Sequence, residues 1–245
     1  MTENHDTCIL LFAKYPKKGM VKLRLCKDLD EDMVLELYRC FVQDTLEMIK
    51  KINVPFFICF HPPEEERKFQ NWLESTYRFL PQQGNDLGER MKNSFTEVFT
   101  QGFKRVILLG SDSPDLPEDY IKQALARLQT KDIVLGPTRD GGYYLIGFRA
   151  TTFTPKVFDE IHWSTPHVFQ ETMMKIQQTQ RSVGLLPIWS DIDTRSDLKN
   201  LISRSKNTSF ITSKTMTYLQ SHQICMESDD EQKTGTESGK RIPHG

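Results

Sequence analysis

The chain of 245 residues and 28.6 kDa contains 38% hydrophobic and 10% aromatic residues, enough to bury the core of one large α/β domain. Its 32 Lys and Arg residues nearly balance 33 Asp and Glu residues, which gives a net charge of −1 and a pI of about 6.6. This balance argues against a dedicated nucleic-acid-binding protein, which usually carries a clear basic excess.

The sequence predicts neither a membrane span nor a secretion signal. No apolar stretch approaches the length that spans a bilayer, and the first six residues are polar, unlike a signal peptide. The five cysteines are an odd number without CxxC spacing, so neither a disulfide framework nor a zinc site is expected. We therefore expect a reduced, cytoplasmic protein that binds no nucleic acid; the sequence indicates no oligomeric state.

Apolar runs alternate with segments of helical periodicity along most of the chain. The run at 8–13 is short and wholly apolar, which is typical of a strand buried on both faces. Apolar residues at three-and-four spacing predict an amphipathic helix over 33–52. Further strands are expected at 54–60, 77–81, 106–109, 133–135, 143–148 and 183–187. Further helices are expected at 63–73, at 86–101, after 115–118, at 168–178 and at 194–203.

This order of elements predicts the fold class. Strands that alternate with helices form βαβ units with right-handed crossovers and a largely parallel sheet. Strands 133–135 and 143–148 lie too close together for a helix between them, so we expect a mixed, mostly parallel sheet of about seven strands. The apolar pattern weakens beyond Thr208, which indicates a domain at 1–210 and a C-terminal extension at 211–245. The polar stretch 227–245 is expected to be disordered.

The segment after the first strand is basic. Residues 14–27 contain six Lys or Arg and no acidic residue, and Pro16 and Gly19 predict a tight loop. Backbone amides in such a loop, together with Lys and Arg side chains, suit the oxygens of a polyphosphate. The alternative is a solvated basic loop, balanced by the four acidic residues within 28–32. The segment matches neither the P-loop nor the GxGxxG pattern, which excludes these two motifs.

Carboxylates follow the strand at 106–109. Asp112 lies directly beyond the strand and beside the basic loop, where Mg²⁺ or Mn²⁺ would find carboxylate oxygens together with substrate phosphates. Asp115 stands three residues before Glu118, with Pro117 between, so we interpret it first as a helix cap and only second as a metal ligand. Asp112 has no capping alternative and is the preferred ligand.

Four further segments have both a structural and a functional interpretation. The DGG sequence at 140–142 is typical of a hairpin turn, yet its glycines would also let a ligand approach. The WSTP sequence at 163–166 is typical of a helix start capped by Thr165. Thr194 is the expected cap of the last helix, and a metal contact would explain the surplus carboxylates in DID, residues 191–193. The segment 83–88 either faces a nucleobase or forms only a loop and a cap.

Together these segments resemble the nucleotide-diphospho-sugar transferase superfamily, whose GT-A fold is shared by many glycosyltransferases and nucleotidyltransferases. The strongest resemblance is to the bacterial and archaeal arsenosugar-biosynthesis-type glycosyltransferases, in FAKYPKKGMVKLRL, GNDLGERM, LGSDSPDLP, LGPTRDGGYYLIGF, WST and DIDTRSDL. It covers about residues 8–200. Molybdenum-cofactor and 2-phospho-lactate guanylyltransferases are more distantly similar. The resemblance implies a three-layer α/β/α GT-A (Rossmann-like) domain.

The resemblance also implies roles for individual residues. Those implied to bind the nucleotide and its phosphates are Lys14, Gly19, Lys22, Arg24, Gly84, Leu87 and Gly88. Those implied to hold the Mg²⁺ or Mn²⁺ cofactor are Asp112 and Asp193. Those implied to face the acceptor are Gly141, Gly142 and Tyr143, with Asp140 as the candidate catalytic base. Leu23 departs from the family pattern, which usually has Thr there, and so puts any phosphate or metal contact of that hydroxyl in doubt.

The expected activity is metal-dependent glycosyl transfer from a nucleotide-diphospho-sugar to a small-molecule acceptor. The cation, Lys22 and Arg24 would neutralise the departing nucleoside diphosphate while an acceptor hydroxyl attacks the anomeric carbon. The alternative is a nucleotidyltransferase that joins a nucleoside triphosphate to a phosphorylated small molecule and releases pyrophosphate. A third reading is a nucleotide-binding protein without turnover. A Ser-His-Asp hydrolase is disfavoured because no GxSxG elbow occurs.

Overall fold

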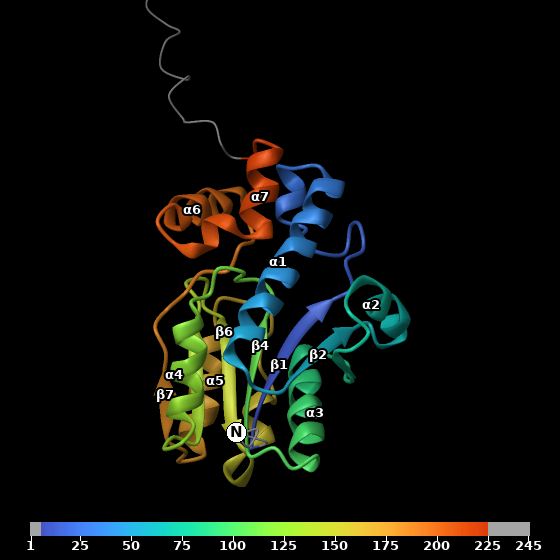
Figure 1. Cartoon of the computed structure of the whole chain (residues 1–245). Coiled ribbons are helices and arrows are strands. Elements are labelled where there is room, and N and C mark those ends of the chain that lie inside the picture. Colours follow the sequence, from blue (N-terminus) through green and yellow to red (C-terminus); the bar gives the residue numbers. More distant parts are fainter. Residues whose placement is uncertain (1–5, 225–245) are drawn as a thin grey trace, which may run out of the picture.

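In the computed structural model, which describes residues 6–224, the chain forms a seven-stranded mixed sheet (Figure 1). The strands are β1 (Thr7–Lys14), β2 (Phe56–His61), β3 (Arg78–Pro81), β4 (Arg105–Gly110), β5 (Ile133–Pro137), β6 (Tyr143–Arg149) and β7 (Val183–Leu185). Their order is β3-β2-β1-β4-β6-β5-β7, and β6 runs antiparallel to both of its neighbours, whereas the other pairs are parallel. The predicted mixed, mostly parallel sheet is confirmed.

Helices connect most of the strands, as the periodicity predicts. The α-helices are α1 (Glu31–Ile52), α2 (Glu66–Trp72), α3 (Leu87–Thr100), α4 (Glu118–Arg127), α5 (Val168–Gln178), α6 (Arg195–Ser205) and α7 (Lys214–Ser221). Short 3₁₀ turns accompany them: η1 (Leu25–Lys27), η2 (Pro63–Glu65), η3 (Ala150–Thr152), η4 (Pro155–Phe158) and η5 (Ser209–Thr212). Within residues 6–224, no helix has the length and apolar character needed to cross a bilayer.

The helices cover both faces of the sheet, so the domain has three layers (Figure 1). Helices α1, α2 and α4 pack on one face, where Ile9, Val42 and Ile121 are fully buried. Helices α3 and α5 and the turn η4 pack on the other face, where the rings of Phe95 and Phe148 meet edge to face at a centroid distance of 5.0 Å. Burial of apolar side chains on both faces explains why the inner strands read as continuous apolar runs.

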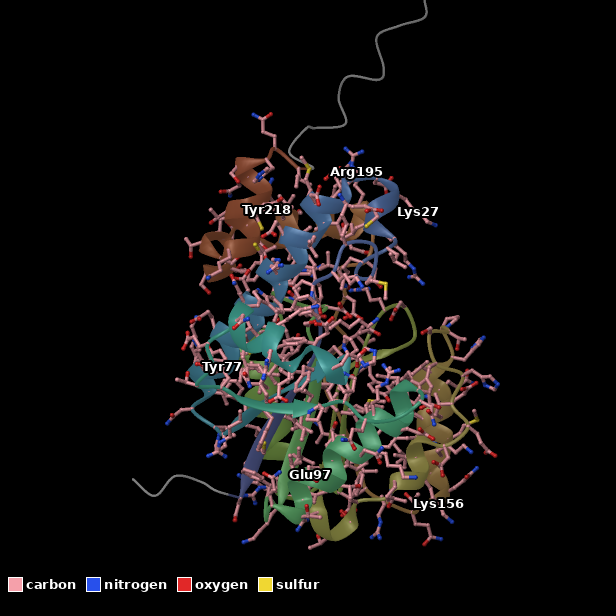
Figure 2. All side chains as sticks on the ribbon, turned by 90° about the vertical axis from the view of Figure 1, so that its right-hand side faces the viewer. Lys27, Tyr77, Glu97, Lys156, Arg195 and Tyr218 are labelled. Atoms are coloured by element: carbon pink, nitrogen blue, oxygen red, sulfur yellow. The ribbon has the colours of Figure 1, made fainter. Side chains whose placement is uncertain are left out.

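A third apolar core lies beyond the sheet, between η1, the first half of α1, α6 and α7. Phe41 and Leu201 are fully buried in it. Figure 1 shows α6, α7 and the first turns of α1 grouped above the sheet, and Figure 2 shows Lys27, Arg195 and Tyr218 at this same end of the molecule. This third core places α6 over the carboxyl ends of the strands, where a ligand of an α/β sheet binds.

The side chain of Asp44 on α1 anchors α7. Its carboxylate accepts hydrogen bonds from the backbone N–H groups of Lys214 (3.0 Å) and Thr215 (2.8 Å), the first two residues of α7. Such a carboxylate satisfies free N–H groups at a helix start and opposes the helix dipole. Part of the predicted extension, 211–224, thus packs against the predicted domain 1–210. The stretch 227–245, for which the sequence predicts disorder, lies outside the described residues.

Two of the predicted helix caps are present. The side chain of Asp86 accepts a hydrogen bond from the backbone N–H of Glu89 at the start of α3. The Glu89 carboxylate, in return, accepts from the N–H of Asn85 rather than from that of Asp86. Thr194 and Asp197 form a complete capping box at the start of α6. Local sequence therefore fixes where these two helices begin.

Two other capping predictions are wrong. The N-cap of α4 is Pro117, and the carboxylate of Asp115 instead binds the guanidinium of Arg204 on α6 at 2.5 Å. A buried carboxylate next to an arginine gains more from the ion pair than from exposed backbone N–H groups. Helix α5 begins at Val168, as predicted, but its N-cap is His167 rather than Thr165. The Thr165 hydroxyl donates to the carbonyl of His162.

Candidate functional site

The candidate site lies where β1 and β4 end. Strands β2 and β3 extend the sheet on one side of β1, and β4 lies on the other, which makes this the topological switch point where open α/β sheets bind ligands. Tyr38 of α1 joins the two strand ends. Its hydroxyl accepts a hydrogen bond from the N–H of Lys14 (2.9 Å), donates to the Lys14 carbonyl (3.2 Å) and lies 3.4 Å from the Ser111 hydroxyl.

The ammonium group of Lys22 lies between two carboxylates. Its Nζ is 2.6 Å from Oδ1 of Asp112, after β4, and 2.9 Å from Oδ1 of Asp193, before α6. The Lys22 side chain is only 4% exposed, and the backbone of Lys22 is in the left-handed region (φ +48°). Burial alone would lower the pKa of Lys22, but the two carboxylates raise it, so the ammonium stays charged. Predicted phosphate-binding and metal-binding residues are thus brought together, and they neutralise one another.

The rest of the basic loop lies more open to solvent. Gly19, at φ +71°, closes the turn in which the N–H of Met20 donates to the Lys17 carbonyl. A Cβ on Gly19 would contact nothing within 4 Å, so the backbone conformation rather than crowding explains the glycine. Arg24 is 65% exposed and lies 3.8 Å from Asp193, and the side chain of Lys14 is also exposed. These cations are free to meet a ligand from solvent.

Asp191 is a half-buried carboxyl at the cleft, one of the two that the sequence marked as surplus and as a possible metal contact. It accepts a hydrogen bond from the Ser113 hydroxyl (2.6 Å), and the N–H of Ile192 next to it donates to the Asp112 carbonyl (2.9 Å). Burial, reinforced by the charge of Asp112, raises the pKa of Asp191 to about 7. In Asp193 the desolvation is outweighed by Lys22, which holds the pKa of that carboxyl below its usual value. The two neighbouring aspartates therefore have different environments.

A cleft of about 880 Å³ opens beside these charges. Its lining comes from the basic loop, the β5–β6 hairpin, the segment after β7 and helix α6: Arg24, Arg139, Asp140, Ile188, Trp189, Ser190, Asp191, Asp193, Thr194, Ser196, Asp197, Asn200, Ser203 and Arg204. A volume of this size accommodates a small-molecule ligand. Of the predicted site residues, Arg24, Asp140 and Asp193 line this cleft directly.

The DGG segment forms the β5–β6 hairpin, so its structural interpretation is confirmed. The exposed carboxylate of Asp140 accepts hydrogen bonds from the Thr138 hydroxyl and from the N–H of Gly142 (3.2 Å). Gly141 has φ +90°, and a Cβ there would collide with the carbonyl oxygen of Pro166. The positive φ and this collision explain Gly141 without a ligand. Asp140 nevertheless lies in the wall of the cleft.

Ten predicted residues do not line this cleft: Lys14, Gly19, Lys22, Gly84, Leu87, Gly88, Asp112, Gly141, Gly142 and Tyr143. The hydroxyl of Tyr143 lies 4.0 Å from the sulfur of Met91, in the apolar layer between sheet and α3, which gives its predicted acceptor contact no support. Gly88 is buried, and a Cβ there would collide with Trp163. Gly84 (φ +139°) and Leu87, 40% exposed, lie at the start of α3. Nucleotide contacts at 84–88 stay a prediction.

Arg139 and Tyr38 are among the site residues that sequence reasoning missed. Arg139 lies in the cleft wall and stands directly before the DGG motif, so its position in the sequence was a usable signal. Tyr38 has no such signal, because its hydroxyl acts across the fold from the middle of an amphipathic helix.

The donor atoms near Lys22 fit a hard cation. Within the described part of the chain, no group of three or more His, Cys, Asp or Glu side chains is arranged to hold a metal ion. Mg²⁺, however, is usually bound by one or two carboxylates, with waters and substrate phosphates supplying the other oxygens. Lys22 contacts only Oδ1 of Asp112 and Oδ1 of Asp193. Their Oδ2 atoms are therefore suitable ligands, though Arg24 lies 3.8 Å from one of them.

Comparison with known proteins identifies the family. Residues 45–165 match the family described as uncharacterized proteins conserved in bacteria (DUF2064). A candidate nucleotide-diphospho-sugar transferase from Desulfovibrio desulfuricans G20 is 43% identical, with a TM-score of 0.87 over 90% of this chain and 96% of that one. The chain belongs to this family of nucleotide-diphospho-sugar transferase-like proteins. A comparison with curated proteins gave no match.

Distant structural neighbours of this family member share its fold. A cytidylyltransferase from Leptospira borgpetersenii is 13% identical, with a TM-score of 0.54 over 91% of this chain and 98% of that one. A CMP:2-keto-3-deoxy-manno-octonic acid synthetase, solved with CTP, is 11% identical, with a TM-score of 0.52 over 81% and 98%. At such low identity the likeness concerns the fold alone. The α/β architecture of the GT-A type is thereby confirmed.

Proposed function

We propose that this protein transfers a glycosyl group from a nucleotide-diphospho-sugar to a small-molecule acceptor, with Mg²⁺ or Mn²⁺ as cofactor. The observation that carries the proposal is the buried Lys22 ammonium between Asp112 and Asp193 at the switch point of the sheet. The two carboxylates held by this ammonium are the candidate ligands of the divalent cation, and they lie beside the loop whose exposed Lys14 and Arg24 suit phosphate oxygens. The identity to a candidate nucleotide-diphospho-sugar transferase supports the same substrate class. The finer likeness to arsenosugar-biosynthesis-type enzymes stays a prediction.

The residues around Lys22 divide the work of donor binding. Lys14 and Arg24, both exposed beside the cleft, bind the outer phosphate oxygens as the donor enters. Lys22, paired with both carboxylates, holds the side chains of Asp112 and Asp193 in place beside the diphosphate. Asp112 and Asp193 would hold the divalent cation, which, when bound, acts as a Lewis acid on the leaving diphosphate. The exposed apolar side chain of Leu23, at 59% exposure, supplies none of these contacts.

Asp140 is the candidate base for the acceptor hydroxyl. It lies in the cleft wall, on the β5–β6 hairpin rather than on the basic loop that would bind the donor. Its carboxylate accepts hydrogen bonds from the Thr138 hydroxyl and the N–H of Gly142. A base must lie within hydrogen-bond reach of the proton that it removes. A carboxylate fixed in a hairpin turn keeps that position without an ordering cost when the acceptor binds.

Nucleotidyl transfer is the competing reaction, and binding distinguishes the two. The test is thermal unfolding of the full chain with UDP-glucose, UDP-GlcNAc, GDP-mannose, CTP, GTP and UTP, each with and without Mn²⁺. A ligand at about one hundred times its Kd adds about 2.7 kcal/mol of stability. For a domain of this size, that raises Tm by roughly 5–11 °C. We expect one nucleotide sugar to stabilise the protein, and only with Mn²⁺.

Variants connect the binding to the site. Lys22→Met and Asp112→Asn should abolish the Tm increase, whereas Lys17→Met, an exposed lysine of the same loop, should keep it. Stabilisation by a nucleoside triphosphate, together with release of pyrophosphate, would show that the reaction is nucleotidyl transfer rather than glycosyl transfer. Binding of a nucleotide sugar without turnover of any acceptor would indicate a non-catalytic protein. No stabilisation by any nucleotide would refute the proposal.

A further inference from the structure

The wall of the cleft contains polar side chains that have no hydrogen-bond or ion-pair partner within residues 6–224. Ser196, Asn200 and Ser203 lie at helical spacing on α6 and point into the cleft, and all three are exposed. Arg139 lines the cleft from the β5–β6 hairpin. Among residues 6–224, no side chain forms an ion pair or hydrogen bond with the guanidinium of Arg139 or with these three polar side chains.

The acidic side chains of the same cleft are, by contrast, all engaged. Asp140 accepts from Thr138, Asp191 from Ser113, and Asp193 from Lys22. Asp197 accepts from the Thr194 hydroxyl in the capping box of α6. The hydrogen-bonding capacity left over in the cleft therefore belongs to one cation and to a row of hydroxyl and amide groups. This combination is complementary to an anion that also carries hydroxyl groups.

An apolar surface adjoins these groups. Ile188 lines the cleft and is 57% exposed. The neighbouring Trp189 is fixed by a hydrogen bond from its indole N–H to Asp115 and by the Arg204 guanidinium 5.3 Å from its ring. The third arginine of the cleft is thus committed to structure, since Arg204 also binds Asp115. Of the arginines in the cleft lining of the described structure, Arg204 is bound to Asp115 and Arg24 is assigned to the donor, which leaves Arg139 for the second substrate.

We propose that the acceptor is a small hydroxylated anion whose carboxylate or phosphate group binds Arg139. This inference rests on the proposed function, since it names the acceptor class of the same cleft. Arg139 directly precedes Asp140 in the chain, so an anion held by the guanidinium has its own hydroxyl groups close to the candidate base. The row of Ser196, Asn200 and Ser203 binds the remaining hydroxyl groups, and Ile188 contacts the carbon chain. Arg139 is a specificity-determining residue in this arrangement.

The test measures binding of simple probes to the full chain by calorimetry, without a donor. The probes are D-glycerate, glycerol 3-phosphate, inorganic phosphate and the uncharged control glycerol. We expect the two organic anions to bind and glycerol not to bind. Arg139→Gln should weaken the anions by at least about tenfold, as the loss of a charged hydrogen bond does. The matched control is Arg67→Gln, an exposed arginine on α2 outside the cleft lining, which should bind them like the wild type.

The outcomes separate this inference from the proposed function. Arg139→Gln should keep the Tm increase with nucleotide sugar and Mn²⁺ while it loses the anions. Glycerate and glycerol 3-phosphate would distinguish a carboxylate from a phosphate as the preferred group. Equal binding by Arg139→Gln and wild type, equal binding of glycerol, or no binding of any anion by a protein that binds nucleotide sugar would overturn the inference. Failure of nucleotide binding in the wild type would instead refute the proposed function.

Discussion

Replacement of Asp44 by alanine should release α7 from the third core. The substitution removes the acceptor for two backbone N–H groups, those of Lys214 and Thr215. Thr215 is fully buried, so its N–H cannot turn to water, and an unsatisfied buried donor costs about 1–3 kcal/mol. Lys214 is exposed and its N–H can be hydrated, so its loss is that of an ordinary cap, about 0.5–1 kcal/mol.

The expected loss from Asp44→Ala is therefore about 1.5–4 kcal/mol in the free energy of unfolding. For a domain of this size that corresponds to a fall in Tm of roughly 3–16 °C. Asp44→Asn, which keeps one oxygen acceptor but places an NH₂ beside an N–H, should lie between alanine and wild type. The matched control is Glu47→Ala on the same helix, whose exposed side chain pairs only with Lys50 and should cost less than about 0.5 kcal/mol.

Thermal unfolding gives the magnitude, and hydrogen exchange gives the place. In Asp44→Ala, the amides of α7 should exchange faster than in the wild type, while those of the central strands β1 and β4 keep their relative protection. The reasoning is refuted if Asp44→Ala loses no more stability than Glu47→Ala. It is also refuted if stability falls but exchange in α7 is unchanged, because the loss would then arise elsewhere than at the helix start.

Three further predictions concern the site. Gly141→Ala should lower the free energy of unfolding by about 2–5 kcal/mol, because it combines a left-handed backbone with a collision against Pro166. Gly102→Ala, also at positive φ but with open space around the new Cβ, should lose only the share that comes from the strained backbone. Equal losses for the two variants in urea unfolding would contradict the collision. Asp191 has a folded-state pKa near 7, above its unfolded value, so the folded state binds the proton more tightly, and stability falls as pH rises from about 4 to about 7. Asp191→Asn should abolish this part of the pH dependence, so that the variant gains on the wild type as pH rises; parallel urea-unfolding curves at all pH values would contradict it. Tyr38→Phe leaves the part-buried N–H of Lys14 without its acceptor, so it should cost about 0.5–1.5 kcal/mol and weaken nucleotide binding. Unchanged binding would show that the ends of β1 and β4 hold together without this hydroxyl.

Most of the fold follows from signals within a few residues of one another. The periodicity of 33–52 predicts α1, and the DGG turn predicts the hairpin between β5 and β6, because each depends only on neighbouring side chains. Helix α7 was not predicted, since it has eight residues and part of its capping comes from Asp44, 170 residues away from Lys214. The predicted capping role of Asp115 was wrong for a similar reason: its partner Arg204 lies 89 residues further along the chain.

The candidate site was predictable as a place but not as a set of pairs. The rule that ligands bind beyond the carboxyl ends of strands brings Lys22, Asp112 and Asp193 into one region. It does not say that the ammonium of Lys22 is buried between the two carboxylates, because that depends on how α6 packs above the sheet. Nor does it show that the pKa of Asp191 is raised while that of Asp193 is lowered, since both residues follow β7 in the same short segment.

The third core has a consequence for folding during synthesis. The contacts of Lys22 with Asp193 and of Asp44 with Thr215 each join residues 171 positions apart, so they form only after nearly the whole chain has left the ribosome. Until then, the apolar stripe of Val34, Leu37 and Phe41 on α1 has no partner from α6 or α7. A nascent chain at this stage displays a surface that chaperones recognise and that promotes aggregation. A stop codon near position 210 would keep α6 but remove α7, so the part of this surface that Met216 and Leu219 cover would stay open, and the product would aggregate more readily than the whole chain.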